Sequence, residues 1–315
     1  MLADLVTSLN ITLPIFIMIL LGWALKSAKL IDDHYLLRAN DIIFRVALPV
    51  KLFYEVSACD LRANMDWRFV AVAIGVSILC MVIAWVVGSL FLKDPADQGA
   101  FIHTSFRGNF AYVGLALLQN VSGGSAMAAA AVVMATVIPL YNIAGVVVLS
   151  LKKPDSGKIN VGRLLLDVVK TPMVLGILVA IPFSLMQIKF PTVVSKPLEY
   201  LSDMVTPMAL LSVGASVSFA SVLHGLREIL PACGLKLIVQ PLIMVPIGVA
   251  LKLPVNEILV LLVLSGTPSA INSYIVTQRM GGNGELASSI VVMTTILSIF
   301  TLTLWLFALK SLGVW

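Results

Sequence analysis

Long runs of apolar residues alternate with short polar breaks along almost the whole chain. Most runs are about 20 residues long, the length that an α-helix needs to cross the hydrocarbon core of a bilayer. The pattern predicts ten membrane-spanning helices, at residues 8–26, 36–56, 67–92, 98–120, 125–151, 170–188, 196–219, 229–251, 255–279 and 285–311. We therefore expect an all-α polytopic membrane protein whose connections are too short to hold a soluble domain.

The composition supports a membrane protein. Apolar residues make up 59% of the 315 residues and charged residues only 12%, whereas soluble domains have about 45–50% and about 25%. The net charge of +5 comes from Lys and Arg that lie mostly between apolar runs, so membrane topology explains it better than nucleic-acid binding. Cys59, Cys80 and Cys233 have neither metal-like nor disulfide-like spacing, and we expect no metal site and no cofactor.

The two halves of the chain resemble each other. A polar linker at 152–169 separates five runs in 1–151 from five in 170–315. Residues 119–136 match residues 278–295 at 7 of 18 positions without gaps. Because each half holds an odd number of runs, the second half would cross the membrane upside down. Such inverted repeats are typical of secondary transporters.

Lys and Arg are distributed unevenly over the connections. Eleven follow the odd-numbered runs, and six lie on the other side of the predicted membrane. The positive-inside rule places the richer side in the cytoplasm and both termini outside, in the periplasm or extracellular space.

Polar and glycine residues interrupt the fourth run, 98–120, and the ninth run, 255–279, near their middles. An unpaired backbone amide or carbonyl is costly in hydrocarbon, so such breaks persist only where the backbone is buried in protein or lines a wet cavity. Half-helices that begin at a break direct N–H groups and a positive dipole end toward the midplane, which suits a carboxylate. The two breaks therefore form the predicted substrate site.

The side chains near these breaks can bind a carboxylate. Asn109 and Asn272 can donate amide hydrogens, and the Arg107 guanidinium can bind a carboxylate in a bidentate way. Alternatively, Arg107 lies nearer the surface or pairs with a protein carboxylate, and the two asparagines join neighbouring helices. The candidate substrate-binding residues are Ser105, Arg107, Gly108, Asn109, Tyr112, Thr267, Pro268, Ser269, Asn272 and Ser273.

Charged residues and prolines also occur in the second and seventh runs. Asp41 and Arg45 are four positions apart and share a helical face, followed by Pro49, while the seventh run holds Asp203 and Pro207. Either Asp41 or Asp203 could couple transport to protons or support the scaffold. Pairing of charges near helix ends is the alternative interpretation.

Three segments carry a resemblance to a known family. They are TLPIFIMILLGWALKSAKLI at 12–31, FRGNFAYVGLAL at 106–117 and GTPSAINSYIVTQRMGGN at 266–283. Together with the five-plus-five pattern, they resemble the auxin efflux carrier family, which includes bacterial malonate and malate carriers and the plant PIN-FORMED auxin transporters.

The resemblance implies a ten-helix fold in which spans four and nine cross at the midplane. It also implies a scaffold of spans 1, 2, 6 and 7, a mobile transport domain of spans 3–5 and 8–10, and a homodimer. Asn109, Pro268 and Asn272 would mark the crossover and the carboxylate site. Plant members have proline at both crossovers, but span four of this chain has none there, which leaves Gly108 or Gly114 as the breaking residue.

We therefore expect a secondary transporter of small organic anions in a bacterial inner membrane, working by elevator-type alternating access. Arg107 favours a dicarboxylate such as malonate or malate, and an aromatic monocarboxylate such as indole-3-acetate is the alternative. The coupling ion would be H⁺ or Na⁺. An intramembrane enzyme is the rival class, but the chain lacks paired catalytic aspartates and an H-E-x-x-H pair.

Overall fold

A computed structural model describes residues 2–58, 66–152, 170, 172–215 and 225–315. Within these ranges the regular elements are all helical. The first half comprises α1 (Leu2–Ser27), α2 (Asp33–Ile42), η1 (Ile43–Ala47), α3 (Leu48–Ala58), α5 (Trp67–Phe91), α6 (Pro95–Phe106), η2 (Phe110–Gly114), α7 (Leu115–Ser122) and α8 (Met127–Leu151). The predicted linker at 152–169 lies, apart from Lys152, outside the described residues.

The second half comprises α10 (Pro172–Leu185), α11 (Thr192–Ala215), α12 (Leu226–Gly234), η4 (Leu235–Val239), α13 (Gln240–Ala250), α14 (Val255–Gly266), α15 (Ile271–Arg279) and α16 (Gly284–Ser311). The η elements are single π-helical turns. η1 lies between α2 and α3, η4 lies between α12 and α13, and η2 is the first turn of the helix that continues as α7. Every predicted apolar run contains one of these helices. The prediction of an all-α membrane protein is therefore confirmed.

Several described helices have the length and composition of membrane spans. Five of them meet both criteria, at Ser8–Ser27, Trp67–Phe91, Met127–Leu151, Leu226–Ala250 and Gly284–Ser311. Shorter apolar helices lie at Phe110–Ser122, Leu175–Leu185 and Val255–Gly266. Two of these three short helices directly adjoin the chain breaks that the sequence predicts, which is why they are too short to span a bilayer alone.

Side chains at the helix ends set where several helices begin. Asp66 caps α5 by accepting a hydrogen bond from the backbone N–H of Arg68. Asp94 caps α6 in the same way, and Pro95 occupies the first helical position, where no N–H is needed. Asn283 caps α16. These caps satisfy backbone donors that the first turn of a helix leaves without intrahelical partners.

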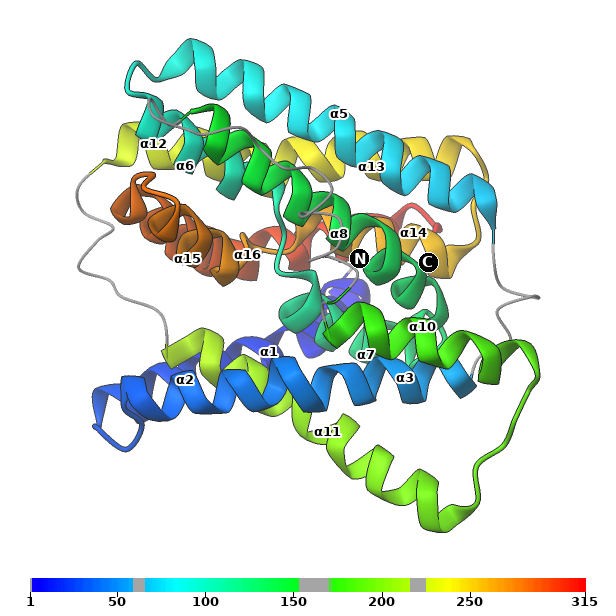
Figure 1. Ribbon diagram of the computed structural model, residues 1–315. Coiled ribbons are helices and arrows are strands. Elements are labelled where there is room, and N and C mark those ends of the chain that lie inside the picture. The colour runs from blue at the N-terminus through cyan, green and yellow to red at the C-terminus, as the bar shows by residue number, and fades with distance from the viewer. Residues whose placement is uncertain (1, 59–65, 153–169, 171, 216–224) are drawn as a thin grey trace.

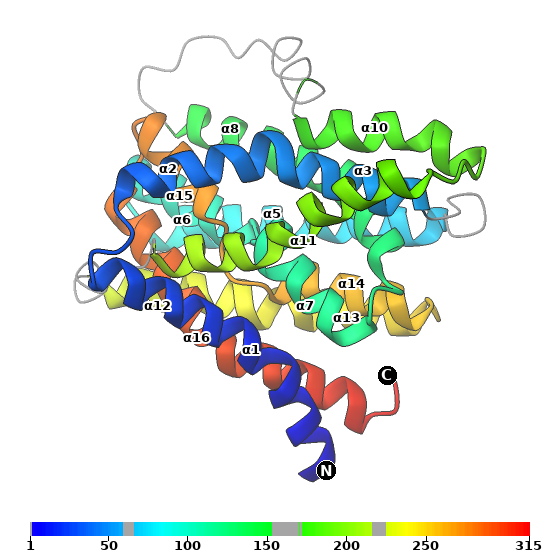
Figure 2. The ribbon, with the colours of Figure 1, turned by 90° about the horizontal axis from the view of Figure 1, so that it is seen from below.

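The helices form two groups that pack against each other (Figures 1 and 2). In one group, α3 packs against α10 and α11, and α11 also packs against α1. In the other, α5, α8, α13 and α16 surround the two broken helices, which are α6 with α7 and α14 with α15. Small residues allow close approach within the first group: Gly22 of α1 lies against the carbonyl of Leu211, and Gly214 of α11 lies against the carbonyl of Ile19.

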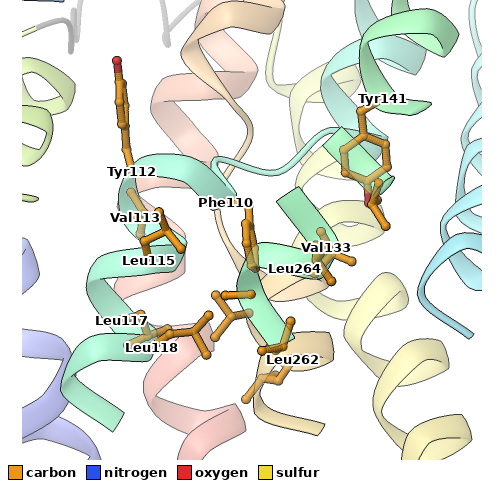
Figure 3. Close-up of a cluster of buried hydrophobic side chains, with 14 of the residues drawn as sticks. Phe110, Tyr112, Val113, Leu115, Leu117, Leu118, Val133, Tyr141, Leu262 and Leu264 are labelled. Atoms are coloured by element: carbon orange, nitrogen blue, oxygen red, sulfur yellow. The ribbon is translucent and has the colours of Figure 1, made fainter. Parts of the chain in front are cut away.

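The core surrounds the two short helices beside the breaks. Every residue of α14 from Glu257 to Gly266 is buried. Figure 3 shows Leu115 and Leu118 on one side, Leu262 and Leu264 on the other, and Phe110 near the centre, all part of the same buried cluster. This packing holds α7 and α14 against each other and thereby fixes the positions of the two breaks.

Candidate functional site: the crossing of two broken helices

The chain leaves helical geometry at two places in the centre of the fold. Helix α6 ends at Phe106, and the next helix begins at Phe110. Helix α14 ends at Gly266, and α15 begins at Ile271. Thr267 is extended, with φ −65° and ψ 150°. Its position before Pro268 explains this, because the proline ring disfavours α-helical geometry for the preceding residue.

The two extended segments meet and pair as a short antiparallel bridge between Gly108 and Ser269. The N–H of Asn109 donates to the carbonyl of Pro268 at 2.7 Å, and the N–H of Ala270 donates to the carbonyl of Arg107 at 3.0 Å. Each break thus satisfies backbone groups of the other, which is the condition for irregular backbone inside a membrane protein.

Gly108 is the breaking residue of the fourth run. A Cβ at this position would lie 2.7 Å from Thr267 Oγ1 and 3.0 Å from the Leu264 carbonyl oxygen, so no larger residue fits without movement. Gly114 is different: it ends η2, and its neighbours are the side chains of Phe110 and Val263. The sequence left both glycines as candidates, and the structure assigns Gly114 to helix packing.

A cavity of about 300 Å³ lies beside the bridge. Its walls come from both broken helices, from α2 and from α8. The lining residues are Asn40, Asp41, Arg107, Gly108, Asn109, Phe110, Ala111, Tyr112, Ile138, Ala270, Ile271, Asn272 and Ile275. Five of the candidate substrate-binding residues are therefore brought together here: Arg107, Gly108, Asn109, Tyr112 and Asn272.

Two helices begin at the cavity wall. One begins at Phe110 and continues as α7, and the other is α15, which begins at Ile271. The first N–H groups of a helix lack intrahelical partners and carry the positive end of the helix dipole. The cavity thus faces two positive helix ends together with the Arg107 side chain, an arrangement that favours an anion.

Arg107 is only 9% exposed and lies at the break itself. It takes part in no ion pair within the part of the chain that the structure describes. Its buried position argues against the alternative of an arginine reaching the membrane surface. Arg107 is one of the residues that line the cavity.

Ser105, Thr267, Pro268, Ser269 and Ser273 do not line the cavity. The Ser269 hydroxyl donates to the carbonyl of Thr104 at 2.7 Å. The hydroxyls of Ser105, Thr267 and Ser273 are buried and have no hydrogen-bond partner among the described residues. Together with the Pro268 carbonyl, these groups belong to the interior of the crossover.

The residues predicted in the second and seventh runs lie outside the crossover itself. Asp41 lines the cavity from α2, and its carboxylate is 3.6 Å from Arg45 Nε in an ion pair with both side chains largely exposed. Pro49 packs its backbone against Gly176 of α10. Asp203 and Pro207 are exposed on α11.

Sequence reasoning missed Asn40, which lines the cavity, and a polar pair behind the bridge. In that pair, Lys236 Nζ donates to Gln240 Oε1 at 2.9 Å and to the Ser265 carbonyl at 2.6 Å. Gln240 Nε2 in turn donates to the Ser105 carbonyl at 2.7 Å. The signal was available: a lysine four residues before a glutamine inside an otherwise apolar run is a mark of function in a membrane helix.

A helical membrane protein with a small cavity at the crossing of two discontinuous helices has the construction of a membrane transport protein. The comparison with known proteins agrees. The chain belongs to the family described as membrane transport protein, whose model matches residues 8–306. This match confirms the predicted resemblance to the auxin efflux carriers.

The similar proteins are transporters by name. The chain is 23% identical to an uncharacterized transporter of Methanocaldococcus jannaschii over 94% of this chain and 97% of the relative. It is 24% identical to a Rhizobium meliloti protein named "Putative malonate transporter", over 96% of each. It is 23% identical to the uncharacterized transporter YfdV of Escherichia coli, over 94% and 95%. The expectation that the chain is a transporter and not an enzyme is confirmed.

Proposed function

We propose that the protein is a secondary transporter of small organic anions and that the cavity at the crossover is its substrate site. The observation that carries this proposal is the Arg107 guanidinium, buried at the break without an ion-pair partner among the described residues. A buried arginine is costly unless its charge is matched. A bound carboxylate supplies the match, and the amides of Asn109 and Asn272 on the same cavity wall add hydrogen-bond donors.

The preferred substrate is a dicarboxylate of the size of malonate or malate. One carboxylate pairs with Arg107, and the second meets the helix starts at Phe110 and Ile271. A cavity of about 300 Å³ holds a molecule of this size with a few waters. The printed name of the Rhizobium meliloti relative agrees with this substrate class.

An aromatic monocarboxylate such as indole-3-acetate is the second candidate. Apolar and aromatic residues, among them Phe110, Tyr112, Ile138 and Ile275, make up much of the cavity wall. Such a wall accepts a flat ring, while Arg107 would bind its single carboxylate.

Transport would proceed by an elevator-type movement of two inverted five-helix repeats. The scaffold would be α1, α2 with α3, α10 and α11, and the remaining helices would carry the crossover. Asn40 and Asp41 then form a fixed wall of the cavity, because they belong to α2. The two broken helices of similar build, one in each half of the chain, support the repeat.

We further propose a homodimer in a bacterial inner membrane with both termini outside. The start of α1 and the end of α16 lie at the same end of the molecule (Figure 2), as an even number of spans requires. H⁺ and Na⁺ are the two candidate coupling ions.

Uptake of radiolabelled malonate into proteoliposomes tests the proposal. Arg107→Gln should lower uptake at subsaturating malonate about 10- to 100-fold, because a charge-assisted hydrogen-bonding pair is lost. Arg68→Gln, which changes an exposed arginine at the start of α5, is the matched control and should leave uptake unchanged.

Unlabelled malate, succinate, lactate and indole-3-acetate, added as competitors, rank the substrate classes. Competition by dicarboxylates alone supports the two-charge site, and competition by indole-3-acetate alone favours the second candidate. Saturable uptake with counterflow separates a carrier from a channel. Equal uptake by wild type and Arg107→Gln would remove Arg107 from substrate binding.

A further inference from the structure

A buried cation lies on the side of the crossover opposite the helix starts. Lys236 is in η4, and none of its surface is exposed. Its ammonium donates to the carbonyls of Ser265 at 2.6 Å and Leu264 at 3.4 Å, and to Gln240 Oε1 at 2.9 Å. All three acceptors are uncharged oxygens, and no ion pair with a carboxylate offsets this charge among the described residues.

These carbonyls belong to the end of a half-helix. Leu264 and Ser265 are in the last turn of α14, where carbonyl groups have no intrahelical donors and carry the negative end of the helix dipole. The Ser105 carbonyl is in the last turn of α6 and accepts from Gln240 Nε2. The pair of Lys236 and Gln240 thus joins the ends of both half-helices.

The ammonium lies directly behind the bridge. A Cβ on Gly108 would be 3.0 Å from Lys236 Nζ. Gly108 also lines the cavity on its other side. The cavity that we assign to the anion and the buried cation are therefore separated by the thickness of one glycine backbone.

In carriers with discontinuous helices, half-helix ends and unwound carbonyls are the groups that coordinate a coupling Na⁺. Here the same kind of groups already hold a positive charge that is covalently attached to the chain. We propose that the Lys236 ammonium is the built-in cation of this crossover, in place of an exchangeable sodium ion, so that binding and transport require no sodium. The claim that transport requires no sodium rests on the proposed function, whereas the cation site itself does not.

The cation site is tested on the purified full-length protein by its melting temperature in NaCl, methylammonium chloride and choline chloride at equal ionic strength. Wild type should melt at the same temperature in all three salts. Lys236→Ser removes the ammonium but keeps the oxygens of Leu264, Ser265 and Gln240. Its melting temperature should be about 3 °C higher in NaCl or methylammonium chloride than in choline chloride, because a ligand that binds the folded state stabilises it.

Lys189→Ser is the matched control, because Lys189 is exposed and its loss creates no cation site. It should melt at one temperature in the three salts. A higher melting temperature of wild type in NaCl than in choline chloride would overturn the proposal, and so would a Lys236→Ser variant that is indifferent to the cation. If Lys236→Ser does not fold, Lys236→Ala, which also leaves the place of the ammonium empty, is measured in its place with the same criteria.

Malonate uptake gives a second readout. Wild-type uptake should be the same when choline replaces sodium on both sides of the membrane, and sodium-dependent uptake would overturn the proposal. If malonate, malate, succinate, lactate and indole-3-acetate are not transported in any salt, the proposed function fails. The melting temperatures then still decide whether Lys236 occupies a cation site.

Discussion

Gly108 is closely confined within the crossover. Its backbone pairs with Ser269, while Thr267 Oγ1, the Leu264 carbonyl and Lys236 Nζ surround the place of a Cβ. The site therefore depends on the absence of a side chain as much as on the amides and the guanidinium around it. The sequence showed a glycine next to Asn109, but it did not show that Thr267, Leu264 and Lys236 would lie around this glycine.

Gly108→Ala should consequently damage both stability and transport. The added methyl would press against backbone and a buried ammonium, and overpacking of this kind costs about 1–3 kcal/mol. We expect a lower melting temperature and a loss of most malonate uptake. Melting curves and proteoliposome uptake measure the two effects.

Gly75→Ala is the control for this substitution. Gly75 lies inside α5, and a Cβ there would meet no atom within 4 Å. Alanine should be tolerated or stabilise the helix by about 1 kcal/mol, because glycine is a poor helix former. Equal behaviour of the two variants would show that Gly108 is not confined as described.

At the scale of the elements, the sequence predicted the helices and the positions of the breaks but not their contacts. A helix that crosses a bilayer needs a long apolar run, so such runs are recognisable in the sequence. The polar interruptions of the fourth and ninth runs are recognisable there too. The pairing of the breaks, the choice between Gly108 and Gly114, and the inward direction of the Ser269 hydroxyl depend on how helices from both halves pack. A single sequence does not record such contacts.

The break between α14 and α15 should depend on Pro268. Proline lacks an N–H and holds Thr267 in extended geometry, so Pro268→Ala would permit the helix to continue through residues 267–270. Continuation would break the hydrogen bonds from Asn109 to Pro268 and from Ala270 to Arg107. We expect malonate uptake to fall at least about 10-fold, in line with the loss of two buried hydrogen bonds.

Pro246→Ala provides the comparison, because Pro246 is an exposed proline inside α13, away from the bridge. It should leave uptake unchanged and, if anything, straighten its helix. Uptake by Pro268→Ala at the level of Pro246→Ala would mean that the break is set by its surroundings and not by the proline.

At the scale of the whole molecule, the cavity lies where the two groups of helices meet. Its wall combines Asn40 and Asp41 from α2 with residues of both broken helices. Among the described residues, the two groups contact each other through packing, such as that of α1 on α16 and of α3 on α8. A relative movement of these groups would change which side of the membrane the cavity faces.

A reporter on the cavity wall can detect that change. Ile275 lines the cavity from α15 and belongs to none of the polar groups that we assign to the anion. In a background without the native cysteines, Ile275→Cys should react with a membrane-impermeant thiol reagent added from either side of the membrane. Malonate should slow the reaction from both sides, because it occupies the same cavity.

The control is Leu117→Cys, since Leu117 is fully buried in the cluster of Figure 3 and should not react from either side. Reaction of Ile275→Cys from one side only, with or without malonate, would contradict alternating access and leave a one-sided binding protein. Reaction from both sides with no protection by malonate, malate or indole-3-acetate would support alternating access. It would also show that these anions do not bind in the cavity. A single uncharged residue thereby tests both parts of the proposal, the movement and the substrate.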